Sequence, residues 1–205
     1  MDHMTSHNWI AFALAGALVG LLAWPTPSEA QTVTGQAQAA QATVQLGILG
    51  GTTTTTLSDT GTLSGTNDAR DASLFSGNIP SLFTVDVLHA TTIGYPDEVD
   101  SEASLADLGL TVAGTGISAD FVMARALAVL GAPGSGSSSI ANLSINGVPF
   151  VVTGDANQTI PIPGGQVVVN EQQTDPSGTI TVNALHVTVS GVADVVISSA
   201  KAGIF

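Results

Sequence analysis

The feature that most constrains the fold is a pair of β-branched segments near the carboxy-terminal end of the sequence. Thr179–Ser190 and Ala193–Ala202 are rich in Val, Ile and Thr, and a short turn around Gly191 joins them. These residue types favour extended backbone because their branched Cβ atoms restrict χ1 and pack well on a pleated surface. Two such segments with so short a connection predict an antiparallel hairpin. Apolar residues occupy both faces of the first segment, which indicates an inner strand of a layered sheet.

The preceding sequence predicts a succession of short strands separated by turn residues. Asn146-Gly147 is the strongest two-residue hairpin signal, because both positions favour positive φ. Residues 117–130 contain helix-favouring Ala, Leu and Met, but their alternation and their similarity to the carboxy-terminal hairpin favour a strand. About ten short strands without a convincing helix predict an all-β protein, an antiparallel β-sandwich over residues 46–205. The other expected strands are residues 42–49, 52–57, 81–93, 104–112, 159–162 and 166–171.

Parts of the carboxy-terminal hairpin resemble earlier segments of the chain. Thr84–Gly94 (TVDVLHATTIG) and Thr181–Gly191 (TVNALHVTVSG) share Thr, Val, Leu, His, Thr and Gly at equivalent positions. Ala119–Ala128 and Ala193–Ala202 share Ala, Asp, Val, Ala and Ala. Two occurrences are too few for a solenoid, which needs three or more regular units. The repeats therefore indicate an internally duplicated sandwich, and chance similarity between short β-branched strings is the alternative.

Residues 1–30 have the features of a secretory signal peptide. The unbroken apolar run Trp9–Trp24 is followed by the small residues Ser28 and Ala30, which suit the site that signal peptidase reads. The run is shorter than the roughly 20 residues that span a bilayer, which favours a cleaved signal over an uncleaved membrane anchor. Residues 31–45 are rich in Gln, Ala and Thr. We expect them to form a flexible lead-in, or a strand donated to the sheet edge of a neighbouring copy.

Composition restricts the classes of partner. The chain has 16 acidic residues against three Lys and Arg, a formal net charge of −13, and no Cys. Nucleic-acid binding needs clustered cations that this chain does not have, and its charge repels anionic membrane surfaces. The expected secreted protein is thus free of disulfides and, after signal cleavage, free of the membrane, so its own core must hold the fold.

The order and spacing of several segments resemble a known family. These segments are VLHATTIG at 87–94, SEASLADLGLTVAG at 101–114, ISADFVMARA at 117–126, SGSSSIANLSINGVPFVVTG at 135–154, NQTIPIPGGQVVVNEQ at 157–172 and the carboxy-terminal hairpin. Together they resemble the choice-of-anchor P family of secreted bacterial proteins. The resemblance covers roughly residues 42–204. It implies an exported surface or extracellular domain without a known reaction. The sequence ends at Phe205 without an LPXTG-like motif, which favours a released or self-assembling product.

Two groups of residues are candidate metal sites. His89 and His186 occupy equivalent places in the repeated segments, and the pairing of those strands would bring the imidazoles together as a metal or pH-sensitive site. The alternative is a half-buried strand histidine with backbone or Thr partners. Four carboxylates of an expected loop are candidate calcium ligands, with a solvated acidic loop as the alternative: Asp97, Glu98, Asp100 and Glu102.

The sequence contains no pattern typical of catalysis. It has no cysteine nucleophile, no G-x-S-x-G elbow and no H-E-x-x-H motif. We therefore expect a secreted, non-enzymatic protein of the cell surface or extracellular matrix, with a structural or adhesive role and an ability to form homo-oligomers or fibres. The alternative is an extracellular ligand-binding module for polysaccharide or calcium. No cofactor is expected apart from that calcium.

Overall fold

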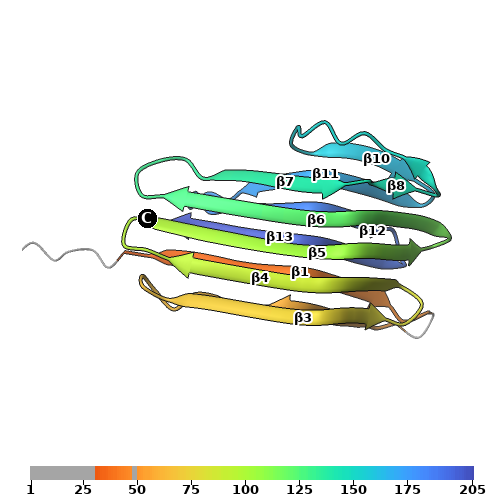
Figure 1. The fold of residues 1–205 in the computed structure, drawn as a ribbon, viewed down its shortest axis with the longest axis horizontal. Helices are drawn as coiled ribbons and strands as arrows, with labels where there is room; N and C mark the ends of the chain where they lie inside the picture. The colour runs from red at the N-terminus through yellow and green to blue at the C-terminus, as the bar shows by residue number, and fades with distance from the viewer. Residues whose placement is uncertain (1–30, 48–49) are drawn as a thin grey trace, which may run out of the picture. The chain divides into compact units, whose positions relative to one another are not determined.

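Strands make up 71% of the chain that the structure describes. The structure is a computed structural model and describes residues 31–47 and 50–205, so the expected signal peptide lies outside the described residues. Thirteen strands of this part form two antiparallel sheets that pack against each other (Figure 1). The prediction of an antiparallel β-sandwich is confirmed. Among the described residues, no helix has the length and apolar character needed to cross a membrane.

Strands that follow one another in sequence mostly lie side by side within a sheet, and the main exception is the pairing of the last strand with the first. The six-stranded sheet, sheet A, consists in spatial order of β10 (Gln158–Ile162), β11 (Gly165–Thr174), β12 (Ile180–Val189), β13 (Ala193–Ile204), β1 (Val33–Gln45) and β2 (Thr52–Asp59). The seven-stranded sheet, sheet B, consists of β3 (Ala69–Ile79), β4 (Phe83–Gly94), β5 (Glu98–Val112), β6 (Thr115–Val129), β8 (Ser144–Ile145) and β9 (Val148–Pro149), with β7 (Ser135–Ala141) also paired with β6.

The predicted hairpins are present. β12 and β13 form the carboxy-terminal hairpin, and β12 lies inside sheet A between β11 and β13. Asn146 and Gly147 connect β8 to β9 with φ of 52° and 75°, the left-handed values that a two-residue hairpin turn requires. Residues 117–130, where helix propensity and alternation disagree, lie almost entirely in β6. Alternation therefore outweighs propensity at β6, because inward-facing Val and Ala side chains pack against sheet A.

The repeated segments have different neighbours. β4 and β12, which carry the first repeat, belong to opposite sheets. β13 pairs directly with β12, whereas β6, which carries the equivalent of β13, is separated from β4 by β5. The hairpins β5–β6 and β12–β13 lie at the centre of the sandwich and pack against each other. The repeated segments therefore have different strand pairings in the two sheets and do not form two equivalent halves of the sandwich.

The core between the sheets is made of Val, Leu, Ile and many Ala side chains. Polar contacts also cross it, among them a pair of buried hydroxyl groups. The hydroxyl groups of Thr92 and Ser101, both fully buried, lie 2.7 Å apart, and Ser101 Oγ donates to the Lys201 carbonyl of the opposite sheet at 2.7 Å. Burying hydroxyl groups is costly unless they are hydrogen-bonded, and each of these two has a partner.

The prediction of a flexible or donated lead-in at residues 31–45 is wrong. These residues contain β1, an inner strand of its own sheet that pairs with both β13 and β2. Beyond the strand, Thr32 and Phe205 exchange two backbone hydrogen bonds of 2.8 and 3.1 Å. The Gln and Thr side chains of β1 face outward, and its Ala side chains fill the core with at most 1% exposure. The compact unit accordingly begins at Gln31 rather than at residue 46.

Sheet packing over β1 is close enough to require glycine at one position. A Cβ atom on Gly35 would lie 2.5 Å from both Leu63 Cδ1 and Thr92 Oγ1. Such a distance is well inside van der Waals contact, so only a residue without a side chain allows this approach. Small residues along β1 therefore let the two sheets come together.

Both sheets interrupt the in–out alternation along a line that crosses their strands. In sheet A the residues of this line face the core, so that pairs of consecutive residues such as Ala39-Ala40 and Ala184-Leu185 are both buried. The register of each strand pair skips this position but keeps the same offset on both sides of it, so neither strand gains a residue. Three of the five residues have left-handed backbone, which exchanges the inward and outward sides of the strand. We call these residues the inner row: Ser58, Ala39, Ser198, Ala184 and Asn170, of which Ser58, Ser198 and Asn170 have φ of 49°, 52° and 51°.

Sheet B has a corresponding line in which the residues face solvent. Consecutive residues such as Asp86-Val87 and Asp120-Phe121 are both exposed there. The Ser198 hydroxyl of the inner row donates to the Val122 carbonyl of β6 at 3.2 Å, so the two lines lie close to each other. We call the sheet B residues the outer row: Phe75, Val87, Asp107, Asp120 and Asn142, of which Val87, Asp107 and Asn142 have φ of 47°, 50° and 54°.

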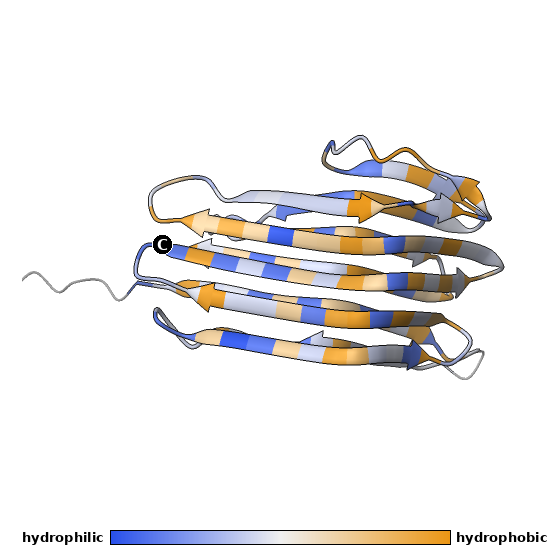
Figure 2. Cartoon of the chain, viewed as in Figure 1, coloured by the Kyte–Doolittle hydropathy of each residue, from blue (hydrophilic) through white to orange (hydrophobic). Residues whose placement is uncertain are grey.

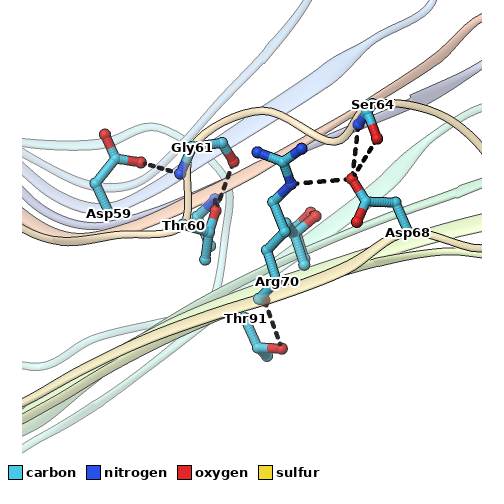
Figure 3. Close-up of polar contacts among 10 residues, drawn as sticks. Asp59, Thr60, Gly61, Ser64, Asp68, Arg70 and Thr91 are labelled. Atoms are coloured by element: carbon cyan, nitrogen blue, oxygen red, sulfur yellow. Dashed lines mark hydrogen bonds and ion pairs between the residues drawn. The ribbon is translucent and has the colours of Figure 1, made fainter.

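The connection from β2 to β3 carries the chain from sheet A to sheet B and is fixed by carboxylates (Figure 3). Asp59 Oδ1 accepts from the Gly61 N–H at 2.8 Å. Asp68 Oδ2 accepts from the Ser64 N–H and hydroxyl at 2.8 and 2.9 Å, and from Arg70 Nε at 2.9 Å. These three donors, led by the Ser64 backbone, lower the pKa of Asp68 to about 2.

Candidate interaction surfaces

The four acidic residues predicted as calcium ligands do not share a loop. Asp97 lies in the turn after β4, whereas Glu98, Asp100 and Glu102 are alternate residues of β5. Alternate residues of a strand repeat at roughly 6.6 Å, while calcium requires all of its oxygen ligands at about 2.3–2.6 Å. The prediction of an acidic loop is wrong. These carboxylates instead form a row along the outer face of β5.

Asp100 in this row is already paired. Arg125 of the neighbouring strand β6 donates from Nε to Asp100 Oδ1 at 3.0 Å and from Nη2 to Oδ2. The paired carboxylate raises the pKa of Arg125, with smaller contributions from Glu102 and Glu98. Within residues 31–47 and 50–205, no three His, Asp or Glu side chains are arranged to hold a metal ion.

The two histidines lie on opposite outer faces of the sandwich. His89 belongs to β4 of sheet B and His186 to β12 of sheet A, so the expectation that strand pairing brings the imidazoles together is wrong. His89 is exposed, and its Nδ1 lies 2.9 Å from the hydroxyl of Ser73 on β3. Similar sequence around the two histidines therefore reflects two similar strands rather than one site.

His186 lies within a polar network that the sequence did not indicate. Its Nδ1 is 2.9 Å from Glu171 Oε2 on β11, and its Nε2 is 3.2 Å from Asp194 Oδ1 on β13. Asn183 Nδ2 also donates to Glu171 Oε2, at 2.6 Å. Three neighbouring strands contribute these groups, so only the strand register reveals their proximity.

This network has the order of a hydroxyl–imidazole–carboxylate triad without its geometry. Thr188 Oγ1 lies 3.4 Å from His186 Nε2, longer than the roughly 2.6–3.2 Å over which a base activates a nucleophile. Asp194 Oδ1 and Oδ2 lie 3.2 and 3.3 Å from the same nitrogen, so Nε2 is already in contact with a carboxylate. The network is suited to tying three strands together rather than to catalysis.

The outer row carries an apolar patch with carboxylates beside it. Phe75 is 87% exposed, Val87 58% and Phe121 37%, on β3, β4 and β6 respectively. In Figure 2, hydrophobic segments of β3, β4 and β6 lie midway along sheet B, close to hydrophilic segments. No sequence motif predicts this patch, because it depends on the positions in sheet B where two consecutive residues both face solvent. We call the following group the outer-row patch: Phe75, Val87, Phe121, Asp86, Asp107 and Asp120.

The two edge strands of sheet A differ in protection. β10 contains Pro161, a residue that sheets tolerate at edges and that disfavours further pairing. β2 contains five consecutive threonines, Thr52–Thr56, and within the described residues it pairs only with β1. Threonine favours extended backbone, and this run has neither charge nor proline. β2 therefore offers an edge open to another strand.

Comparison with known proteins identifies no function for the outer-row patch or for the edge of β2. No protein-family model, curated protein or solved structure matches this chain.

Proposed function

We propose that this protein is a secreted, non-enzymatic component of the cell surface or extracellular matrix that associates with further copies through the open edge of β2. The observation that carries the proposal is the uncharged threonine run on an edge strand. Unprotected edges are templates for strand addition, and soluble proteins ordinarily block them with charge, proline or a covering loop. Pairing of β2 with β2 of a second copy would extend sheet A across both molecules.

Other observations support the structural and exported parts of this proposal. The apolar segment and small residues within 1–30 favour export, as does the resemblance to choice-of-anchor P domains. The one hydroxyl–imidazole–carboxylate arrangement we identified has the geometry of a strand tie rather than of a catalytic group. A rigid two-sheet body with an open edge suits an assembling subunit.

The test is the mass of the purified full chain in solution, measured by sedimentation velocity over a range of concentrations. We expect a dimer that dissociates on dilution. Thr54→Lys places a charge on the open strand, where Thr54 lies opposite Thr43 of β1, and should give a monomer. Thr181→Lys adds the same charge to the outer face of the inner strand β12, so it should leave the dimer intact. A monomeric wild type at every concentration, or equal effects of both substitutions, contradicts the proposal.

A further inference from the structure

The geometry points to the outer-row patch as a docking surface for a cationic amphipathic helix of another protein. The patch combines exposed apolar side chains with carboxylates on neighbouring strands of one sheet face, and this combination determines the chemistry of the occupant. This inference is independent of association through β2, which lies in the other sheet.

The apolar part of the patch exceeds what isolated surface residues provide. Phe75 lies opposite Val87, between the pairs Leu74–Leu88 and Ser76–Asp86. Phe121 of β6 lies opposite Ala106 of β5, which in turn lies opposite Asp86 of β4. Phe75 and Val87 are thus neighbours, and Phe121 lies two strands from Val87, across β5. Grouped exposed apolar side chains mark interaction sites more often than scattered residues do.

Backbone energetics add a second observation at Val87. A β-branched residue with φ of 47° is a genuine outlier, because its branched Cβ crowds the backbone in the left-handed region. The other left-handed members of both rows are Ser, Asn or Asp, which tolerate this conformation better. The left-handed backbone alone would favour Asn or Gly at position 87, so the valine contributes an exposed apolar side chain where the backbone does not require one.

Charge determines which partner fits. Asp86, Asp107 and Asp120 are all exposed and lie on the successive strands β4, β5 and β6. A second copy of this chain would place like charges against each other on a protein of net charge −13. The apolar run within residues 1–30 has no Lys or Arg to neutralise them. A partner with Lys or Arg beside an apolar face satisfies both parts of the patch.

Spacing favours a helix as the form of that partner. Neighbouring strands lie about 4.8 Å apart, so successive carboxylates repeat at nearly the roughly 5–6 Å between helix positions i and i+3 or i+4. The four strands β3 to β6 that carry the patch span roughly 14 Å. A helix of about 10 residues has this length, so one amphipathic helix laid across the strands would cover the patch.

The binding test uses the purified full chain and a dye-labelled 14-residue peptide with Leu on one helical face and Lys beside it. Fluorescence anisotropy should show saturable binding that weakens as salt is added. Replacing the three aspartates together by Asn should weaken binding about tenfold, because each exposed ion pair contributes modestly. A matched triple, Asp97→Asn, Glu98→Gln and Asp155→Asn, removes the same charge elsewhere and should bind like wild type.

The apolar contribution is tested with Phe75→Ser and Phe121→Ser together, which should also weaken binding about tenfold. Val87→Asn controls for misfolding, because it removes an apolar side chain and at the same time relieves backbone strain. Binding should weaken although the variant is at least as stable as wild type. Equal binding of a peptide with Glu in place of Lys would overturn the proposal. So would unchanged binding by the aspartate triple, or self-association through the patch measured by sedimentation.

Discussion

The inner and outer rows share left-handed backbone at several positions, but the side chains of the inner row face the core and those of the outer row face solvent. In each sheet, left-handed residues interrupt the alternation along a line across the strands. In sheet A the residues of the row enter the core, and Ala39, Ala184 and Ser198 are fully buried. In sheet B they face solvent, with Phe75 and Val87 more than half exposed. The hydrogen bond from Ser198 to the Val122 carbonyl of β6 brings the two rows close together.

Because one row is buried and the other exposed, different physical factors limit which residues each row can hold. Inner-row residues are limited by volume, since interiors are close-packed and have no room for added atoms. Outer-row residues are free of that limit, and their side chains are available for contacts with other molecules. Substitutions at equivalent places in the two rows should therefore have unequal effects on stability.

The largest difference is expected between Ala184→Leu and Asp120→Leu. Neither position has left-handed backbone, but Ala184 is fully buried and Asp120 is exposed. Overpacking at Ala184 should lower the free energy of unfolding by about 3 kcal/mol. Asp120→Leu should change it by less than about 0.5 kcal/mol. Urea denaturation measures both values, and equal losses would contradict the distinction between the rows.

Removal of the contact that joins the rows should have the next largest effect. Ser198→Ala deletes the buried hydroxyl that donates to the Val122 carbonyl and leaves that carbonyl without this partner. The free energy of unfolding should fall by about 1–2 kcal/mol. Ser139→Ala removes an exposed hydroxyl of β7 and should have little effect in the same urea experiment. Similar values for the two variants would show that the contact contributes nothing.

Val87→Asn should change stability in the opposite direction. Asn tolerates left-handed backbone better than Val, so the free energy of unfolding should rise by about 1 kcal/mol. Val148 is also exposed but has no positive φ, and Val148→Asn should bring no gain. A loss of stability in Val87→Asn would mean that the valine packs in a way its exposure does not suggest.

The smallest effect is expected at the connection between the two sheets, as a dependence on pH. The pKa of Asp68 is lowered from 3.8 to about 2, so its stabilising contribution is complete above its ordinary pKa and lost as pH falls through about 2. The stability of wild type relative to Asp68→Asn should therefore decline between about pH 4 and pH 2. Urea midpoints at several pH values measure this, and a difference independent of pH would exclude the carboxylate as its source.

The parts of the fold predicted from sequence are those fixed by local chemistry. β12 and β13 follow from β-branched composition, and the turn at Asn146 follows from its tolerance of positive φ. β1 could have been found from its alternating Gln and Ala, but Ala is a weak signal of a core position and the repeat slips at Ala39-Ala40. Glu98, Asp100 and Glu102 suggested a loop because acidic residues are depleted in strands, although Val99, Ser101 and Ala103 alternate with them.

The candidate surfaces could not be predicted in the same way, because they depend on long-range register. Glu171, His186 and Asp194 meet only when β11, β12 and β13 are aligned. Phe75 and Phe121 lie on one face only because β3 and β6 belong to one sheet and both strands interrupt their alternation at this level. A left-handed valine is also contrary to its local preference, so no sequence rule anticipates Val87.

The pairing of β1 with β13 has a mechanical consequence. Because residues 32 and 205 lie side by side at the same end of two antiparallel strands, tension between them would open the ladder like a zipper. Each step would load one pair of hydrogen bonds, rather than shearing all the bonds between the strands at once. If the sandwich were instead held at one chain end and at its outer face, the force would be shared by many of the hydrogen bonds between strands. How the protein is held would therefore determine how much force it can bear.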